Sequence, residues 1–282
     1  MELFVEHLTV IDASFLDAAR GLVGESWIVD LALEGELDEQ GMVMDFGPMK
    51  KKLKAAIDAS ADHTLIVPKR AAALSVLQGG EQVTLRFEDQ SGQVMIHESP
   101  AQALCWVDAE AVTIESLRQH VLGILQRAVP GNVKQIHLTL RHEDIPGPYY
   151  HYSHGLKHHD GYCQRIAHGH RSKFELWLDG IRDEALMQRW AARWQDIYLG
   201  TREDLVATVS EQGRDYYQFA YQARQGRFAL RIAADRCEIM ETDSTVEHIA
   251  QFIATSARAQ SGAGTARARA YEGVHKGAVA TA

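Results

Sequence analysis

The chain has 282 residues, 46% of them hydrophobic, which is enough to bury one large core or two of ordinary size. Its formal net charge of −9 argues against a nucleic-acid partner, because phosphate contacts need concentrated lysine and arginine. The first residues lack the basic and apolar regions of a signal peptide and no apolar run approaches a membrane span, so we expect a cytoplasmic protein without a membrane partner.

The first half of the chain predicts a strand, a helix, a β-hairpin, a second helix and a last strand, in that order. The first helix follows from Met49, Leu53 and Ile57, which recur at i, i+4 spacing. The hairpin follows from two alternating runs on either side of Ser91-Gly92. The five elements cover residues 22–35, 49–60, 83–97, 113 onward and 135–140.

The second half predicts the same order of elements, over residues 167–180, 186–197, 217–232, 244 onward and 266–271. Both halves keep two glycines eleven residues apart, at 24 and 35 and at 169 and 180. The spacing from a helix-end aspartate to a helix-opening threonine also agrees, at 51 residues (62 to 113) and 49 residues (196 to 245). This agreement indicates a tandem duplication of one unit that already carried the hairpin.

The segment Ile145-Pro146-Gly147-Pro148 predicts the linker between the two units, which we place at residues 1–145 and 149–282. The run from Ser244 to Glu247 predicts a capping box at the start of the last helix. Residues 257–265 are rich in Ala, Ser and Gly, and we expect a flexible connection there.

His168-Gly169-His170 stands at the start of a predicted strand. Residues i and i+2 of a strand point to the same face, so both imidazoles point toward one place. His154 on a neighbouring strand would supply a third nitrogen and leave the fourth tetrahedral position open, as in a catalytic zinc site. The alternative is three ordinary histidines among the fourteen of the chain.

The three cysteines, Cys105, Cys163 and Cys237, are too few and too scattered for a disulfide framework, which agrees with a reducing compartment. Cys163 lies five residues before His168, in a segment with Asp160 and Gly161, and we expect it to be catalytic. The alternatives are a small buried side chain or a fourth zinc ligand that closes the site.

Cys163, His168-Gly169-His170 and the helix-end pair Asp62-His63 together resemble the 6-pyruvoyltetrahydropterin synthase and 6-carboxytetrahydropterin synthase family. The resemblance covers nearly the whole chain, twice over, apart from the inserted hairpins. It implies an α+β tunnelling fold, with an antiparallel four-stranded sheet and two helices on one face in each repeat. It also implies a homo-oligomer, a barrel with active sites at interfaces.

The resemblance implies that the two repeats have diverged in complementary ways. The second repeat has the complete zinc set, which is His154, His168 and His170, together with the catalytic Cys163. At the equivalent ligand positions the first repeat has Ser14, Val23 and Glu25, and it should bind no zinc.

Conversely, the first repeat keeps the Asp62-His63 pair, whereas the second has Asp196-Ile197 at the aligned position. We therefore expect one composite site, with zinc and Cys163 from one repeat and Asp62-His63 from the other. The alternative for this pair is a helix-end histidine that benefits from the helix dipole.

The family also holds the pterin ring with a glutamate at the end of its last strand, and Glu272 matches that position, followed by Gly273 in place of the usual threonine. The counterpart in the first repeat, Arg141-His142-Glu143, is out of register by one, and no role is carried over to it. For substrate phosphates, Lys157 and Arg165 are the candidates in the loop between the ligands.

These implications give a zinc-dependent enzyme that converts 7,8-dihydroneopterin triphosphate to 6-carboxy- or 6-pyruvoyl-tetrahydropterin, by metal-assisted proton transfer and triphosphate elimination. Cys163 would take a proton from the carbon beside the ring, and His63, oriented by Asp62, would be the acid or base on the other face. Glu272 would fix the small-molecule pterin. The alternatives are a non-catalytic pterin- or metal-binding protein and a dihydroneopterin aldolase-like lyase.

Overall fold

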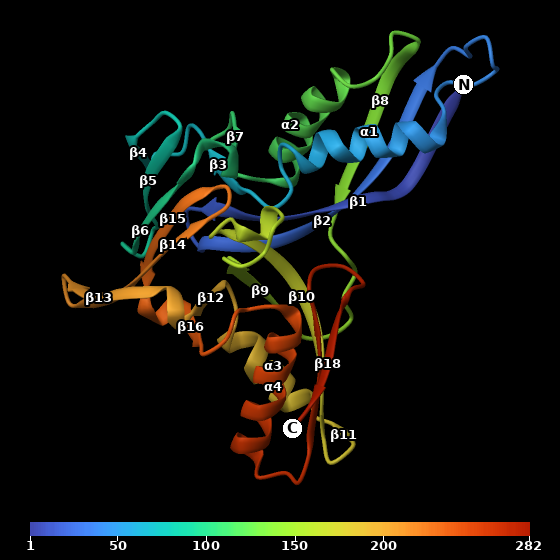
Figure 1. The fold of residues 1–282 in the computed structure, drawn as a ribbon. Coiled ribbons are helices and arrows are strands. Elements are labelled where there is room, and N and C mark those ends of the chain that lie inside the picture. The colour runs from blue at the N-terminus through green and yellow to red at the C-terminus, as the bar shows by residue number, and fades with distance from the viewer.

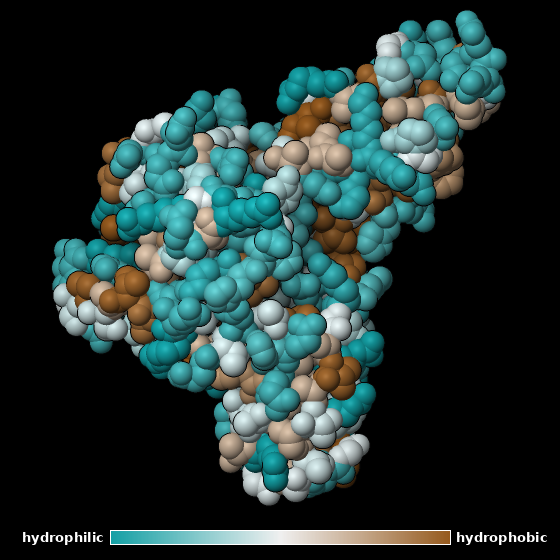
Figure 2. All heavy atoms as spheres, viewed as in Figure 1, coloured by the Kyte–Doolittle hydropathy of each residue, from teal (hydrophilic) through white to brown (hydrophobic).

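The computed structural model describes residues 1–282 and has three parts (Figure 1). One part carries the N-terminus and the helices α1 and α2, and a second carries the C-terminus and the helices α3 and α4. The third consists of the hairpin strands and lies to the left in the view of Figure 1. The face in Figure 2 is mostly hydrophilic, with small, separate apolar patches.

The first sheet has five strands in the order β7-β3-β1-β2-β8. Their bounds are β1 Glu2–Asp17, β2 Gly21–Gly35, β3 Leu65–Pro68, β7 Leu104–Val107 and β8 Val133–Arg141. The helices that pack on it are α1 Phe46–Asp58 and α2 Ile114–Gln126. A core of 22 buried residues lies between the helices and this sheet, so the first repeat has a core of its own.

The second sheet has seven strands, with six in the order β16-β12-β9-β10-β17-β18 and β11 paired to β10. Their bounds are β9 Tyr149–His154, β10 His168–Leu178, β11 Ile181–Arg182, β12 Ile197–Thr201, β16 Cys237–Met240, β17 Ala266–Tyr271 and β18 Gly277–Thr281. Its helices are α3 Glu184–Arg193 and α4 Val246–Ser261. A separate core of 19 buried residues lies here.

The third sheet joins the hairpins of both repeats in the order β13-β14-β15-β6-β5-β4. Its strands are β4 Leu74–Gln78, β5 Gln82–Glu88, β6 Val94–Pro100, β13 Leu205–Glu211, β14 Arg214–Ala223 and β15 Gly226–Ala233. The two predicted hairpins are therefore confirmed, and strands β6 and β15 pair with each other. A third core of 18 residues, drawn from both repeats, packs here and ties the repeats together.

The α+β tandem fold is confirmed, and the sheets differ in one respect from the expected four antiparallel strands. Only β1, β2 and β8 of the first sheet are antiparallel neighbours, whereas β3 runs parallel to β1 and β7 runs parallel to β3. The second sheet repeats this pattern with β12 and β16. Short strands on each side of the inserted hairpin add to the sheet because their backbone groups need partners.

Three local predictions were wrong. Helix α3 ends at Arg193, so Trp194 is its C-cap and Ile197 already begins β12. The N-cap of α4 is Thr245, which places His248 and not Glu247 at the third helical position. Helix α4 continues to Ser261 and ends at Gly262 with φ +69°, so much of the segment expected to be flexible is helical.

The two repeats cross each other at two glycines, Gly24 of β2 and Gly169 of β10. A Cβ at Gly24 would lie 1.9 Å from the Tyr152 carbonyl oxygen, and one at Gly169 would lie 2.6 Å from the Gly24 Cα. Beside them, Ser14 Oγ donates a hydrogen bond to Ser153 Oγ at 2.7 Å. Only glycine permits this backbone approach, which brings the strand ends of both repeats to one place.

The chain leaves β8 at Arg141 and enters β9 at Tyr149, so the predicted linker connects the first sheet to the second. None of the four helices is long and apolar enough to cross a membrane.

Candidate metal and catalytic centre

Three histidines of the second repeat converge on one point. His154 in β9 is directly opposite His168 in β10, and His170 lies two residues further along the same strand. All three are fully buried, and their candidate ligand nitrogens lie within 4.8 Å of one another. His154 Nε2 is 3.3 Å from His170 Nε2. Two nitrogens bound to one tetrahedral zinc lie about 3.3 to 3.4 Å apart.

Two of the three rings are held through Nδ1 by backbone carbonyl oxygens, and the Nδ1 of the third faces a carboxylate. His154 Nδ1 lies 3.1 Å from the Ser244 carbonyl oxygen, and His168 Nδ1 lies 2.9 Å from that of Arg165. His170 Nδ1 lies 3.3 Å from Asp12 Oδ1. These partners orient the rings so that the Nε2 atoms are free to act as ligands.

The buried nitrogens fit a metal ion. His168 Nε2 is buried without any partner, and such orphaned polar atoms are rare in folded proteins. Burial lowers the pKa of His154 and of His168 well below the usual range, which favours the neutral imidazole that binds metals. The three-histidine group can therefore hold a cation, and its three nitrogens leave one of four tetrahedral positions to another ligand.

Asp12, in β1 of the first repeat, is a site residue that the sequence analysis missed. It is 3% exposed, accepts a hydrogen bond from Ser26 Oγ at 2.5 Å and faces His170. Burial alone would raise its pKa, but His170 and Lys276 outweigh burial and hold the pKa well below its usual value. The available signal was a charged residue within the apolar run Val10-Ile11-Asp12-Ala13.

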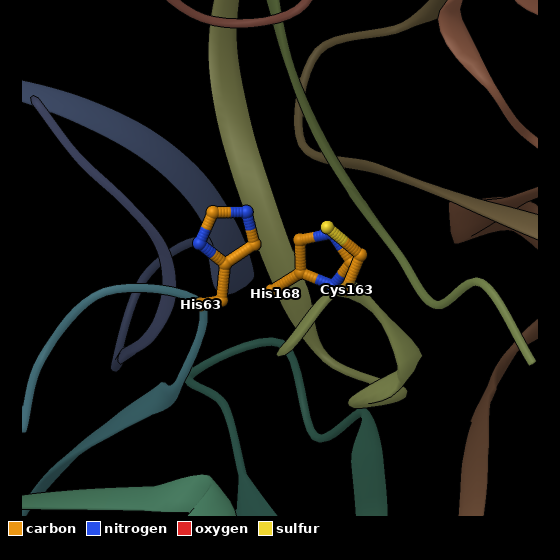
Figure 3. A group of neighbouring side chains, drawn as sticks. All are labelled: His63, Cys163 and His168. Atoms are coloured by element: carbon orange, nitrogen blue, oxygen red, sulfur yellow. The ribbon is translucent and has the colours of Figure 1, made fainter. Parts of the chain in front are cut away.

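Asp62 and His63 of the first repeat lie against this histidine group, within the same chain. His63 Nδ1 is 2.7 Å from Asp62 Oδ2, and the other oxygen, Asp62 Oδ1, accepts the backbone N–H of Asp12 at 2.8 Å. The ligand atoms of His63, Cys163 and His168 all lie within 4.8 Å of one another (Figure 3). The structure thus brings together residues separated by about a hundred positions in sequence.

Cys163 lies in a short 3₁₀ turn, Tyr162–Gln164, and is partly exposed. Burial disfavours the charged form of His63, but hydrogen bonds with Asp62 and Cys163 outweigh it and raise the pKa of His63 to about 10. His63 also has φ +52°, an uncommon conformation for a residue with a side chain. Its backbone N–H donates to the backbone carbonyl oxygen of Asp12 at 2.8 Å, which fixes this turn.

Strand pairing corrects the alignment of the two repeats by one residue. Gly24 pairs with Ser14, and Gly169 pairs with Ser153, so the residue equivalent to His154 is Phe15 and not Ser14. By the same register, Ser14 pairs with Leu65, and Ser153 pairs with Tyr198.

Leu65 and Tyr198 are therefore equivalent, and the residues two positions before them are His63 and Asp196. The counterpart of His63 is thus Asp196 and not Ile197. Asp196 also has a positive φ, of +56°. The two repeats therefore share the turn, while its side chain differs between a histidine and an aspartate.

The counterpart of the histidine centre is filled by charged side chains. Asp196 receives two hydrogen bonds from the Arg20 guanidinium, at 2.9 and 2.5 Å. Glu25, at the place of His170, lies 3.5 Å from His142 and 3.7 Å from His151. Val23 and Phe15 offer no ligand, so this second place lacks the three-histidine arrangement.

A lysine, Lys276, links Glu272 to the histidine centre. Lys276 Nζ is 3.5 Å from Glu272 Oε2 and also 3.5 Å from Asp12 Oδ2. A Cβ at Gly273 would lie 2.4 Å from Asp12 Oδ1, so the carboxylate that faces His170 occupies the space of a side chain there. This contact gives a physical reason for glycine at position 273.

The duplicated α+β fold and the three-histidine centre define a tandem tunnelling-fold protein with a site able to hold a metal ion. Residues 11–145 match the family profile described as 6-pyruvoyl tetrahydropterin synthase. The first repeat of the chain is thus similar to this family over nearly its whole length.

Two similar solved structures are 6-pyruvoyltetrahydropterin synthases of Plasmodium. The Plasmodium falciparum protein is 18% identical over 50% of this chain and 90% of its own, with a TM-score of 0.41. The Plasmodium vivax protein is 19% identical over 50% of this chain and 97% of its own, with a TM-score of 0.37. No curated protein matches the chain.

Proposed function

We propose that the chain is a zinc-dependent pterin enzyme that converts 7,8-dihydroneopterin triphosphate to 6-carboxy- or 6-pyruvoyl-tetrahydropterin. The observation that carries the proposal is the meeting of Asp62-His63 from one repeat with Cys163 and the three histidines of the other. A binding protein has no need of a cysteine and an aspartate-oriented histidine beside its metal ligands.

His154, His168 and His170 would hold the zinc through their Nε2 atoms. When bound, zinc supplies Lewis acidity toward the side-chain hydroxyls of the substrate. Since the first repeat offers Phe15, Val23 and Glu25 at the corresponding places, we propose one zinc per chain.

The acid-base groups are Cys163 and His63. The Nδ1–H of His63 donates to Asp62 Oδ2, and the raised pKa of His63 means that Nε2 takes and keeps the proton of the Cys163 thiol, which leaves a thiolate. The sulfur can then take the proton from the substrate carbon beside the pterin ring. Glu272, at the end of β17, would bind the amino group and ring N–H of the pterin and so set the position of that carbon.

We also propose that the chain forms a homo-oligomer. The outermost strands of the two sheets have a sheet partner on one side only; they are β7 and β8 in the first sheet and β16 and β18 in the second. An open strand edge is a template for pairing with another chain. Light scattering on the eluting peak of a sizing column would give the mass, and a mass near 31.4 kDa would contradict this part of the proposal.

The test of the function is incubation of zinc-loaded protein with 7,8-dihydroneopterin triphosphate, with products identified by mass spectrometry. We expect a tetrahydropterin with a changed C6 side chain and release of inorganic triphosphate. Release of a two-carbon aldehyde with the phosphates retained would show aldolase-like cleavage instead. Tight pterin binding without any product would show a non-catalytic protein.

A further inference from the structure

Arg165 is a buried cation without an acidic partner. Arg165 is 4% exposed, and its Nε donates a hydrogen bond to the Gln225 side-chain oxygen at 3.1 Å. One Nη donates to the carbonyl oxygen of His63 at 3.3 Å, and the guanidinium lies 4.3 Å from the ring centre of Tyr162. All of these partners are neutral, whereas buried charges are ordinarily paired.

The first repeat provides an internal comparison. Arg20 precedes Gly24 by four residues, just as Arg165 precedes Gly169. Arg20 is neutralised by the two hydrogen bonds from its guanidinium to Asp196. Near Arg165, the position that corresponds to Asp196 is occupied by His63. The Arg165 guanidinium therefore has no carboxylate to pair with, and its charge stays unpaired.

Arg165 lines a cavity of about 530 Å³, a volume within the range of small-molecule sites. The polar residues that line it with Arg165 include Ser60, Gln102, His120, Tyr162 and Gln225. They offer several hydrogen-bond donors and no carboxylate. The other loop cation, Lys157, is already paired with Glu203 and Asp204 at 2.7 and 2.8 Å.

Arg165 also joins this cavity to the histidine centre, because its carbonyl oxygen holds His168 Nδ1 at 2.9 Å while its side chain lines the cavity. We propose that the cavity is an anion subsite in which Arg165 binds phosphate groups of a substrate whose reacting part lies at Cys163 and His168. This inference rests on the proposed function for the identity of the substrate, but the anion site itself does not.

The first test measures binding of inorganic tripolyphosphate to the full chain by calorimetry, with metal content checked before and after. Arg165→Gln should weaken binding about ten- to a hundred-fold, as expected for lost hydrogen bonds to a charged group. Gln225→Glu keeps the arginine but gives it an acidic partner, as Asp196 does for Arg20, and should weaken binding similarly. Lys157→Gln is the matched control and should change the Kd by no more than about twofold.

Unchanged affinity in both Arg165→Gln and Gln225→Glu, or no binding to the wild type, would overturn the subsite. Because the second variant removes no buried group, a folding failure of the first leaves the test intact.

The second test separates the substrate from free phosphate. In Arg165→Gln the KM for 7,8-dihydroneopterin triphosphate should rise about ten- to a hundred-fold, while binding of 7,8-dihydroneopterin, which lacks phosphates, should stay the same. Tripolyphosphate binding that depends on Arg165, with an unchanged KM, would contradict the assignment to the substrate. If pterin turnover itself is absent, the tripolyphosphate result still decides the anion site.

Discussion

The carboxylate of Asp12 lies 3.3 Å from Nδ1 of His170, so a residue of the first repeat supports a candidate metal ligand of the second. A carboxylate at this place fixes the ring orientation and makes the opposite nitrogen a better ligand. The repeat that lacks a three-histidine set of its own therefore still contributes to the centre.

Asp12→Asn should lower zinc affinity about ten- to a hundred-fold, because the amide removes the charge while it keeps the size of the side chain. Competition with a chelator measures the affinity. Asp58→Asn is the control, since Asp58 pairs with Lys54 at the surface end of α1 and should leave zinc binding unchanged. Equal affinity of Asp12→Asn and wild type would reduce Asp12 to a packing role.

Cys163→Ala should keep zinc and lose about a hundred- to ten-thousand-fold in turnover, the usual contribution of a positioned acid-base group. Cys237 serves as the control, because it begins β16, outside the cavity and the histidine centre, and burial raises its pKa. Cys237→Ala should leave the rate of product formation unchanged. Steady-state assays measure the turnover of both variants, and similar rates would show that Cys163 has no part in the mechanism.

Gly24→Ala should destabilise the fold by about 1 to 3 kcal/mol, since the added Cβ meets the Tyr152 carbonyl oxygen where the repeats cross. Gly123 in α2 has open space around its Cα, and Gly123→Ala should stabilise by about 0.5 to 1 kcal/mol. Urea unfolding of both variants tests the crossing. A neutral Gly24→Ala would contradict this close backbone contact.

Glu25 should make stability depend on pH. Burial, outweighing hydrogen bonding to Ser26 and the charges of Arg171 and Arg20, raises its pKa from 4.5 to about 7. Below pH 4.5 the group is neutral in both states. Between pH 4.5 and 7 only the unfolded chain loses the proton, so stability falls with rising pH, by about 1.4 kcal/mol per unit.

The same principle makes Glu25→Gln gain stability relative to the same protein with Glu25 between pH 4.5 and 7, with a constant difference above that range. Because His142 and His151 lie 3.5 and 3.7 Å from Glu25, both proteins of the comparison carry His142→Gln and His151→Gln, so neither imidazole titrates. Chemical unfolding at a series of pH values measures the difference. A difference independent of pH would show that Glu25 has an ordinary pKa.

Local patterns predicted much of the fold from the sequence. The i, i+2 spacing of His168 and His170 placed both on one face of a strand, and the structure pairs His154 directly opposite. The hairpins and the strand over Ala266–Tyr271 followed from alternation and turn residues. These features depend on residues that are close in sequence, so a single amino-acid sequence is enough to predict them.

Contacts between the repeats could not be predicted in this way. The alignment of Ser14 with His154 was wrong by one because ladder pairing, and not residue identity, sets the register. Asp12 has a role only through the other repeat. The joining of β6 to β15 likewise depends on how two separate hairpins meet, which the pattern of either hairpin does not contain.

The most direct test of the composite centre is zinc content, melting temperature and turnover of His63→Asn, measured on the same sample. Asparagine tolerates the positive φ at this position and leaves the three ligands intact. We predict zinc content and melting close to wild type, with turnover reduced at least a hundred-fold. Wild-type turnover in zinc-loaded His63→Asn would contradict the claim that the first repeat supplies a catalytic group to the second.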